Sequence, residues 1–140
     1  MIVIRTKRLT ENAKLPSCMH TGDAGFDIKA TSVKYDEKND CTIFGTGLAF
    51  EIPHGYAMFI YPRSSCYKNA ALMFNCVAVI DSGYRGEVHV IFKGHDTKYK
   101  VGDRIAQAII MPIPQVGYLD SNFISSSDRG EFGLGSTGNN

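Results

Sequence analysis

Five short polar segments interrupt the apolar stretches of this sequence, and each carries residue types that can act on a charged ligand. In the first, Asp23 and Asp27 lie on either side of a glycine. Their carboxylate oxygens are ligands that suit magnesium, although a polar turn before a strand is the commoner role of such a segment. The second places Arg63, Ser64 and Ser65 directly after an apolar run. Its guanidinium, hydroxyls and backbone N–H groups suit a phosphate if Ser65 opens a helix; a capping serine beside a surface arginine is the equal alternative.

The third segment combines an acid, an aromatic ring and an amide around the apolar run 77–80. Asp81 ends that run, and Tyr84 follows after a glycine-containing turn. A carboxylate there can be a simple turn former, but a strand end is also where a rigid scaffold aims a base at a water molecule. Asn75 lies within an apolar stretch, so its amide needs either a structural network or a ligand.

The last two segments are weaker signals when each is taken alone. Around a turn at residues 102–103, Asp103 and Arg104 favour structural salt bridges, and Gln107 lies on an otherwise apolar strand where its amide needs partners. Segment 129–138 joins Arg129 to glycines and hydroxyls, which can wrap an anion. It lacks the Gly-Lys-Ser/Thr of a Walker loop, and on local grounds a floppy tail is the better interpretation.

These segments need a β framework to position them. Apolar runs punctuated by glycine and proline predict strands near residues 2–5, 41–52, 56–61, 72–80, 87–92 and 104–111. Runs 56–61 and 77–80 are continuously apolar, as in strands buried on both faces, whereas 88–92 begins as a strict alternation. A short turn or helix is expected within residues 65–71. The spacing is typical of a sandwich or closed barrel such as a jelly roll, followed by a polar, glycine-rich tail.

Length and composition indicate one globular domain. The chain has 140 residues, 44% of them apolar, and its 15 basic and 14 acidic residues give a net charge of +1. This excludes a disordered chain and argues against stable nucleic-acid or membrane-surface binding. No apolar run reaches the roughly 20 residues of a membrane-spanning helix, and the charged N-terminus does not fit a secretion signal. We therefore expect a cytoplasmic location, or the host cytoplasm if the source is viral.

Segments 23–27, 62–65, 75–87, 102–107 and 129–138 together resemble, in order and spacing, the five motifs of the trimeric deoxyuridine triphosphatases, or dUTPases. The most specific pieces are Val79-Ile80-Asp81-x-x-Tyr84 and the terminal Gly-Ser-Thr-Gly. The resemblance implies an all-β, jelly-roll-like barrel or sandwich over residues 1–124. It also implies a flexible, glycine-rich arm over residues 125–140 that closes over a neighbouring subunit's active site in a homotrimer.

The resemblance further implies hydrolysis of dUTP to dUMP and pyrophosphate. Asp81 would activate the water that attacks the α-phosphate, Gln107 would brace the phosphate or water, and Arg129 would clamp the γ-phosphate. Tyr84 would pack under the deoxyribose and exclude a 2′-hydroxyl. Mg²⁺ would be held mainly by the substrate phosphates, with Asp27 holding one of its waters. The substrate contacts implied are Arg63, Ser64, Ser65, Asn75, Val79, Ile80, Asp81, Tyr84, His89, Arg129, Leu134, Gly135, Ser136 and Thr137.

One departure from the family pattern is Leu134, which stands where the arm usually carries an aromatic residue. Two alternative functions stay open. A dCTP deaminase-like enzyme needs a glutamate in its base pocket, and no glutamate is found at the corresponding place, because Glu87 lies past Gly86. A non-catalytic binding protein on the same fold is the second alternative, and the intact Asp81, Arg129 and arm argue against it.

Overall fold

The computed structural model describes residues 1–132, and all of their regular structure is β apart from one short 3-10 helix. The elements are β1 (Arg5–Arg8), β2 (Phe26–Lys29), β3 (Ser32–Asp36), β4 (Cys41–Gly45), β5 (Leu48–Glu51), β6 (Tyr56–Tyr61), η1 (Cys66–Asn69), β7 (Ala78–Ile80), β8 (His89–Lys93) and β9 (Arg104–Pro112). No helix in this part of the chain is long and apolar enough to cross a membrane.

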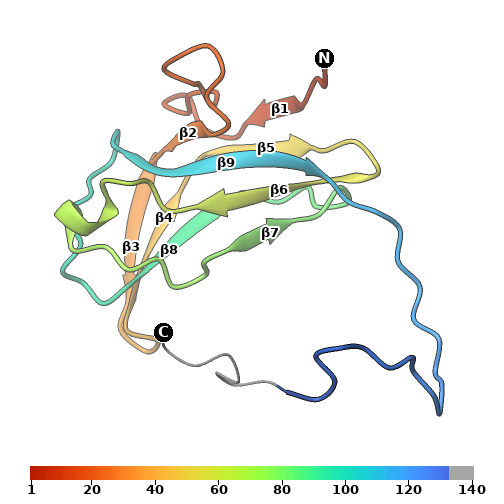
Figure 1. The fold of residues 1–140 in the computed structure, drawn as a ribbon. Helices are drawn as coiled ribbons and strands as arrows, with labels where there is room; N and C mark the ends of the chain where they lie inside the picture. The colour runs from red at the N-terminus through yellow and green to blue at the C-terminus, as the bar shows by residue number, and fades with distance from the viewer. Residues whose placement is uncertain (133–140) are drawn as a thin grey trace.

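The strands form three antiparallel sheets with the orders β1-β5, β2-β9-β6-β7 and β3-β4-β8. The four-stranded sheet lies in front of the three-stranded sheet in Figure 1. Strands β7 and β8 are edge strands of these two different sheets. The all-β, jelly-roll-like architecture expected from the sequence is confirmed.

The core fills the space between the two larger sheets. Phe44 and Phe92, both fully buried, meet edge to face at 5.8 Å on β4 and β8, and Ile28, Ile60 and Ile105 of the other sheet join the same cluster. Each such side chain contributes roughly 1.5–3 kcal/mol of burial free energy. The alternation predicted for residues 88–92 is confirmed, because Val88, Val90 and Phe92 are buried.

Several predicted strand limits are wrong. The run 41–52 is two strands, since the chain changes sheets at Gly47, whose φ of +64° favours glycine and whose Cβ would contact Ala13 at 3.0 Å. The first strand spans Arg5–Arg8 rather than 2–5, because ladder pairing with β5, not apolarity, defines it. Strands β2 and β3 were missing from the prediction; their short, polar sequences carry little apolar signal.

The run 72–80 differs most from the prediction. Only Ala78–Ile80 pairs as a strand, and residues 72–77 form an irregular segment joined to β8 by Phe74 N to Ile91 O at 2.6 Å and Lys93 N to Leu72 O at 2.9 Å. Val77 and Val79 are 41% and 54% exposed, so burial on both faces is wrong for this run. For 56–61 the prediction is confirmed, because all its side chains are buried or half-buried.

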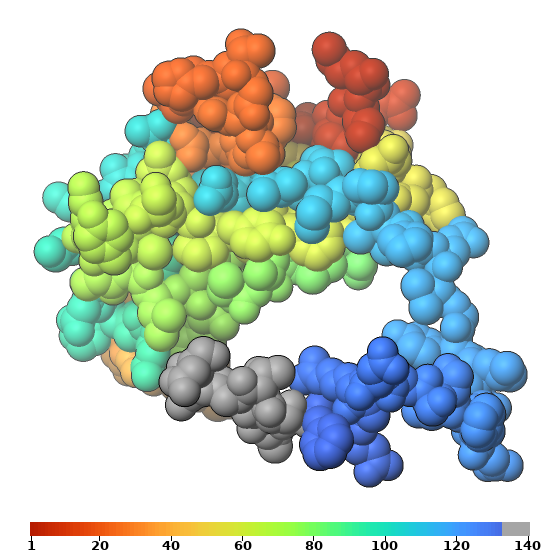
Figure 2. Space-filling view, in the orientation of Figure 1, coloured from red at the N-terminus to blue at the C-terminus, as the bar shows by residue number. Residues whose placement is uncertain are grey.

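The described part of the tail leaves the body after β9. Residues 113–132 contain no strand or helix and are exposed throughout. Figure 1 shows this segment turning away from the sheets, and Figure 2 shows it standing clear of the body on that face. The domain boundary after residue 124 stays a prediction.

Candidate functional site

A charged cluster forms where β2, β9 and the segment after β6 meet. Asp27 pairs with Gln107 across the β2–β9 ladder, and Gln107 pairs with Tyr61 at the end of β6, which brings Arg63 alongside. Arg63 Nε donates to Asp27 Oδ1 at 2.7 Å, and Arg104 Nη1 donates to Oδ2 at 3.0 Å. The Asp27 side chain is only 13% exposed. Both carboxylate oxygens therefore anchor guanidinium groups in a largely desolvated position.

The same cluster fixes the turn that carries the predicted phosphate ligands. Gln107 Nε2 donates to the Pro62 carbonyl at 2.9 Å, and Arg63 Nη1 donates to Ser65 Oγ at 3.3 Å. Ser65 occupies the N-cap position of η1 without a side-chain capping bond. Asp27, Arg63, Ser65, Arg104 and Gln107 are called the Asp27 cluster below.

The two acids of the first segment have different roles. Asp23 Oδ2 accepts a hydrogen bond from His20 N at 2.9 Å in an exposed turn, which is the plain turn-forming role. Gly25, between them, lies against Gln107: a Cβ there would collide with Gln107 Oε1 and lie 3.2 Å from its Cδ. The close approach of this backbone therefore sets the position of the Gln107 amide.

A second polar site lies where the edges of the two larger sheets diverge at β7 and β8. A cavity of about 420 Å³ is lined by Asn75, Ala78, Val79, Ile80, Asp81, Tyr84, Glu87, Val88, His89 and Ile91. Asn75 Oδ1 accepts a hydrogen bond from Ile91 N at 3.2 Å, so its amide N–H groups remain for a ligand. Asp81 follows β7 directly and is exposed. We call this the Asp81 pocket.

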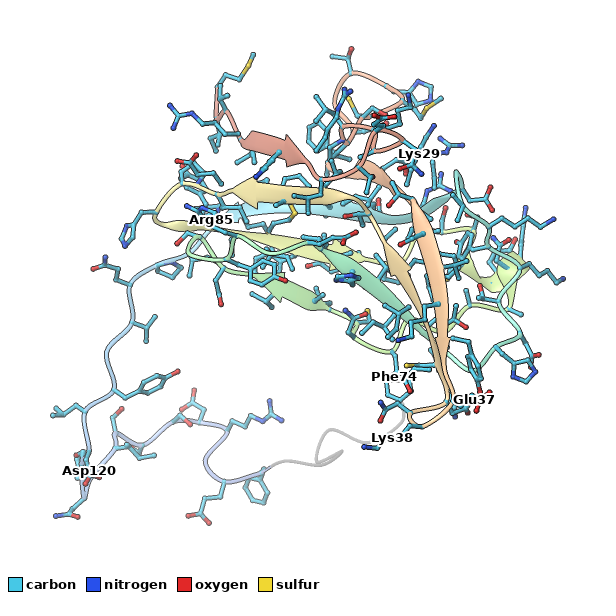
Figure 3. The ribbon with its side chains drawn as sticks, turned by 180° about the vertical axis from the view of Figure 1, so that it is seen from behind. Lys29, Glu37, Lys38, Phe74, Arg85 and Asp120 are labelled. Carbon is cyan, nitrogen blue, oxygen red and sulfur yellow. The ribbon has the colours of Figure 1, made fainter. Side chains whose placement is uncertain are left out.

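The turn after Asp81 is braced by its own side chains. Tyr84 Oη donates to the Glu87 carbonyl at 2.9 Å, and a Cβ on Gly86 would collide with the same hydroxyl. Arg85 Nη1 donates to the carbonyls of Ser82 at 2.6 Å and Tyr84 at 2.9 Å. Figure 3 shows Arg85 at one end of the body and Phe74, from the segment before β7, at the other. The tyrosine ring is therefore held at the rim of the pocket.

Glu87 is a pocket residue that sequence reasoning did not assign. Its Oε1 accepts from Gly47 N at 2.7 Å, and its Oε2 lies 3.6 Å from His89 Nε2. Strand alternation could have found it, since Glu87, His89 and Ile91 share the parity that faces the cavity. Glu87 thus lines the pocket although it lies past Gly86, and its carboxylate is engaged by the protein itself.

The Asp27 cluster and the Asp81 pocket are well separated within one chain. Continuing the β6–β7 register places Asp81 level with Ala57, four residues along β6 from the Tyr61 that pairs with Gln107. With about 4.8 Å between strands and about 3.3 Å per residue, the backbone positions of Asp81 and Gln107 are about 16 Å apart. The structure thus collects the predicted site residues into two groups rather than one.

The tail residues join neither group. Arg129 is exposed, with its Nε donating to Phe132 O at 2.9 Å within a local turn. Figure 3 places Asp120, on the same tail, away from the body. Leu134, Gly135, Ser136 and Thr137 lie outside the described residues. Within residues 1–132, no three His, Cys, Asp or Glu side chains are grouped to hold a metal ion.

Known proteins resemble this chain in both fold and sequence. The dUTPase family matches residues 11–138. The deoxyuridine 5′-triphosphate nucleotidohydrolase of Clostridium acetobutylicum is 37% identical over 99% of this chain and 98% of its own length, and that of Nautilia profundicola is 36% identical over 96% and 98%. A solved structure of the Staphylococcus bacteriophage 80alpha dUTPase with dUPNHPP aligns with a TM-score of 0.82 at 27% identity, covering 99% of both chains. The chain therefore belongs to the dUTPase family of enzymes.

Proposed function

We propose that this protein hydrolyses dUTP to dUMP and pyrophosphate by attack of a water molecule on the α-phosphate. The observation that carries the proposal is Asp81, an exposed carboxylate at the end of a strand and in the wall of a pocket sized for a nucleoside. Asp81 takes a proton from the water, the water oxygen bonds to the α-phosphorus, and the bond to the bridging oxygen of pyrophosphate breaks.

The Asp81 pocket supplies recognition of base and sugar. The free amide N–H groups of Asn75 and the backbone of Val79 and Ile80 read the uracil edge, and His89 lies on the opposite wall. The Tyr84 ring, held by its bond to the Glu87 carbonyl, packs under the deoxyribose and leaves no room for a 2′-hydroxyl. The expected specificity is for deoxyribose over ribose and for uracil over cytosine.

The Asp27 cluster supplies the phosphate contacts. Arg63 uses Nε and Nη1 within the protein, which leaves its Nη2 and the hydroxyl hydrogens of Ser64 and Ser65 as donors for the substrate phosphates. Asp27 holds the guanidinium in place before substrate arrives, so little ordering is left to do on binding. Arg129, Leu134, Gly135, Ser136 and Thr137 complete the site, with the arginine and hydroxyls on the γ-phosphate.

The cluster fits Mg²⁺ through water rather than by direct coordination. Each Asp27 oxygen already accepts one guanidinium N–H, and a carboxylate oxygen has two acceptor positions, so each can still accept a hydrogen from a metal-bound water. The substrate phosphates would be the direct ligands of the ion. When bound, Mg²⁺ neutralises charge on the phosphate oxygens.

The separation of the two groups supports an assembly with shared sites. A base must lie within about 3 Å of the water whose proton it takes, whereas the backbones of Asp81 and Gln107 in one chain are about 16 Å apart, too far for both side chains to contact one α-phosphate unless both are fully extended. A homotrimer, in which the Asp81 pocket of one subunit faces the Asp27 cluster of the next, brings them together. The arm of a subunit then closes over the joint site.

Pyrophosphate release from dUTP, UTP, dTTP and dCTP with Mg²⁺, beside a mass measurement of the assembly, tests the proposal. We expect turnover of dUTP alone and the mass of a trimer. Ammonia release from dCTP would instead show a deaminase, with Glu87 as its pocket glutamate. Absence of turnover with all four nucleotides would contradict the proposal.

A further inference from the structure

Glu87 contacts both the body of the domain and the side chains of the Asp81 pocket. Its side-chain Oε1 accepts a hydrogen bond from Gly47 N at 2.7 Å, at the corner where the chain passes from β4 to β5. Its backbone carbonyl accepts from Tyr84 Oη at 2.9 Å and lies 3.1 Å from His89 Nδ1. Glu87 therefore links two pocket side chains to the framework that carries them.

The corner between β4 and β5 is shaped around this carboxylate. A Cβ on Gly45 would lie 2.6 Å from Glu87 Oε1, so only glycine leaves room for the side chain there. The Glu87 side chain is 29% exposed, and within residues 1–132 the one basic side chain paired with it is that of His89, at 3.6 Å. The shorter bond from Gly47 N is charge-assisted, and it is the contact that fixes the carboxylate in place.

The turn that carries Tyr84 is anchored at its far end by Glu87. On the β8 side of Glu87 the backbone is fixed, since Val88 N donates to Leu48 O at 3.0 Å. On the other side, the hydrogen bonds of residues 82–86 in the described chain stay within the segment 81–87. The tyrosine hydroxyl is therefore tied to the body of the domain through the Glu87 residue.

We propose that Glu87 is a positioning residue for selection of the sugar. The bond from Gly47 holds the carboxylate, and the Glu87 carbonyl then holds the Tyr84 ring where a 2′-hydroxyl would collide with it. The proposal rests on the packing of Tyr84 under the deoxyribose in the proposed function. Glu87 itself touches no sugar and acts through Tyr84. Without its carboxylate the ring is less firmly held, and a displacement of about 1 Å is enough to loosen such a site.

The test compares Glu87→Ala with Glu87→Gln, whose amide oxygen can still accept from Gly47 N. Competition binding gives the ratio of the Kd for UMP to the Kd for dUMP. For Glu87→Ala we expect this ratio to fall about tenfold, the equivalent of one hydrogen bond. Glu87→Gln should keep the wild-type ratio. An unchanged ratio in Glu87→Ala, or an equal loss in Glu87→Gln, would overturn the proposal.

Glu51→Ala is the matched control, because Glu51 pairs with Arg5 at 3.2 Å on the surface and lines no part of the Asp81 pocket. Its nucleotide ratio should equal that of the wild type. Thermal unfolding of all three variants separates sugar selection from stability. A lower melting temperature for Glu87→Ala with an unchanged ratio would assign Glu87 a structural role alone and overturn the proposal.

A double-mutant cycle with Tyr84→Phe tests the route of the effect. Tyr84→Phe removes the hydroxyl that binds the Glu87 carbonyl, so by itself it should also lower the ratio. In that background Glu87→Ala should cause no further loss, whereas additive losses would show that Glu87 does not act through Tyr84. If the wild-type protein fails to hydrolyse dUTP but Glu87→Ala still lowers the binding ratio, the proposed function is wrong and the role of Glu87 stands.

Discussion

The carboxylates of the Asp27 cluster and the Asp81 pocket differ in burial and in hydrogen bonding. Asp27 is 13% exposed and bonded to two arginines that come from different elements of the chain. Asp81 is exposed at the mouth of a cavity. The first acid organises positive charge inside a single subunit, whereas the second is left free to act on a ligand. Preorganised binding groups and an available base therefore occupy separate regions of one fold.

The difference follows from what covers each edge of the four-stranded sheet. Asp27 lies on the edge strand β2, but it pairs with Gln107 of β9 on one side and forms an isolated bridge to Ser17 on the other, so its backbone is held on both sides. Asp81 follows β7, a three-residue strand at the opposite edge of the same sheet. Edge positions leave side chains and backbone groups available to a ligand or another chain. A substitution of Asp27 should therefore lower stability and activity together, whereas a substitution of Asp81 should lower activity alone.

The strongest test of the comparison is Asp81→Asn. Loss of a general base should lower kcat for dUTP by roughly 10²- to 10⁴-fold. The melting temperature should not change, because the side chain is exposed, and dUPNHPP should still bind. Steady-state pyrophosphate release and thermal unfolding measure the two effects. Asp120→Asn, an exposed tail acid in Figure 3, is the matched control. Near-normal turnover of Asp81→Asn would refute the mechanism.

Asp27→Asn should have a mixed effect. The amide carries no charge to pair with Arg63 and Arg104, and we expect a loss of about 2 kcal/mol in the free energy of unfolding. The KM for dUTP should rise as well, because Arg63 is no longer held in place. Urea unfolding and steady-state kinetics report the two effects. Asp23→Asn, which alters only an exposed turn bond, should change neither. A stability loss without a rise in KM would separate Asp27 from the site.

The sequence was informative where chemistry and local pattern coincide. Asp81, Tyr84 and Asn75 were predicted as one group and line one cavity, because they lie within a short stretch of chain. The burial of Asp27 between two arginines depends on the β2–β9 register, and β2 itself was not predicted. Likewise, Val77 and Val79 are as apolar as core residues, and only the edge position of β7 explains their exposure.

Gly25→Ala probes the Asp27 cluster with a smaller change. The new methyl group would collide with Gln107 Oε1 and displace the amide from the Pro62 carbonyl. We expect about tenfold lower kcat/KM, close to the value of one hydrogen bond, with a small change in melting temperature. Gly117→Ala is the control, because nothing lies near its added Cβ and its φ is unremarkable. Equal activity of the two variants would show that the Gln107 position is not critical.

Thiol labelling compares the two regions without a substitution in either. Cys76 is exposed next to Asn75, Cys66 is half-buried at the start of η1 next to Ser65, and Cys41 is buried in β4. Burial raises the pKa of Cys41. The thiolate is the reactive form, and a raised pKa means that less thiolate is present at a given pH. Burial and the raised pKa therefore both slow the labelling of Cys41. With a disulfide reagent at pH 8, mass spectrometry of timed samples should show Cys76 modified first, Cys66 later and Cys41 only in denaturant. Raising the pH should increase the labelling rate of Cys41 only slightly, because burial still limits access to its thiol. Labelling of Cys66 before Cys76 would mean that the turn at Ser65 is more open than the Asp81 pocket.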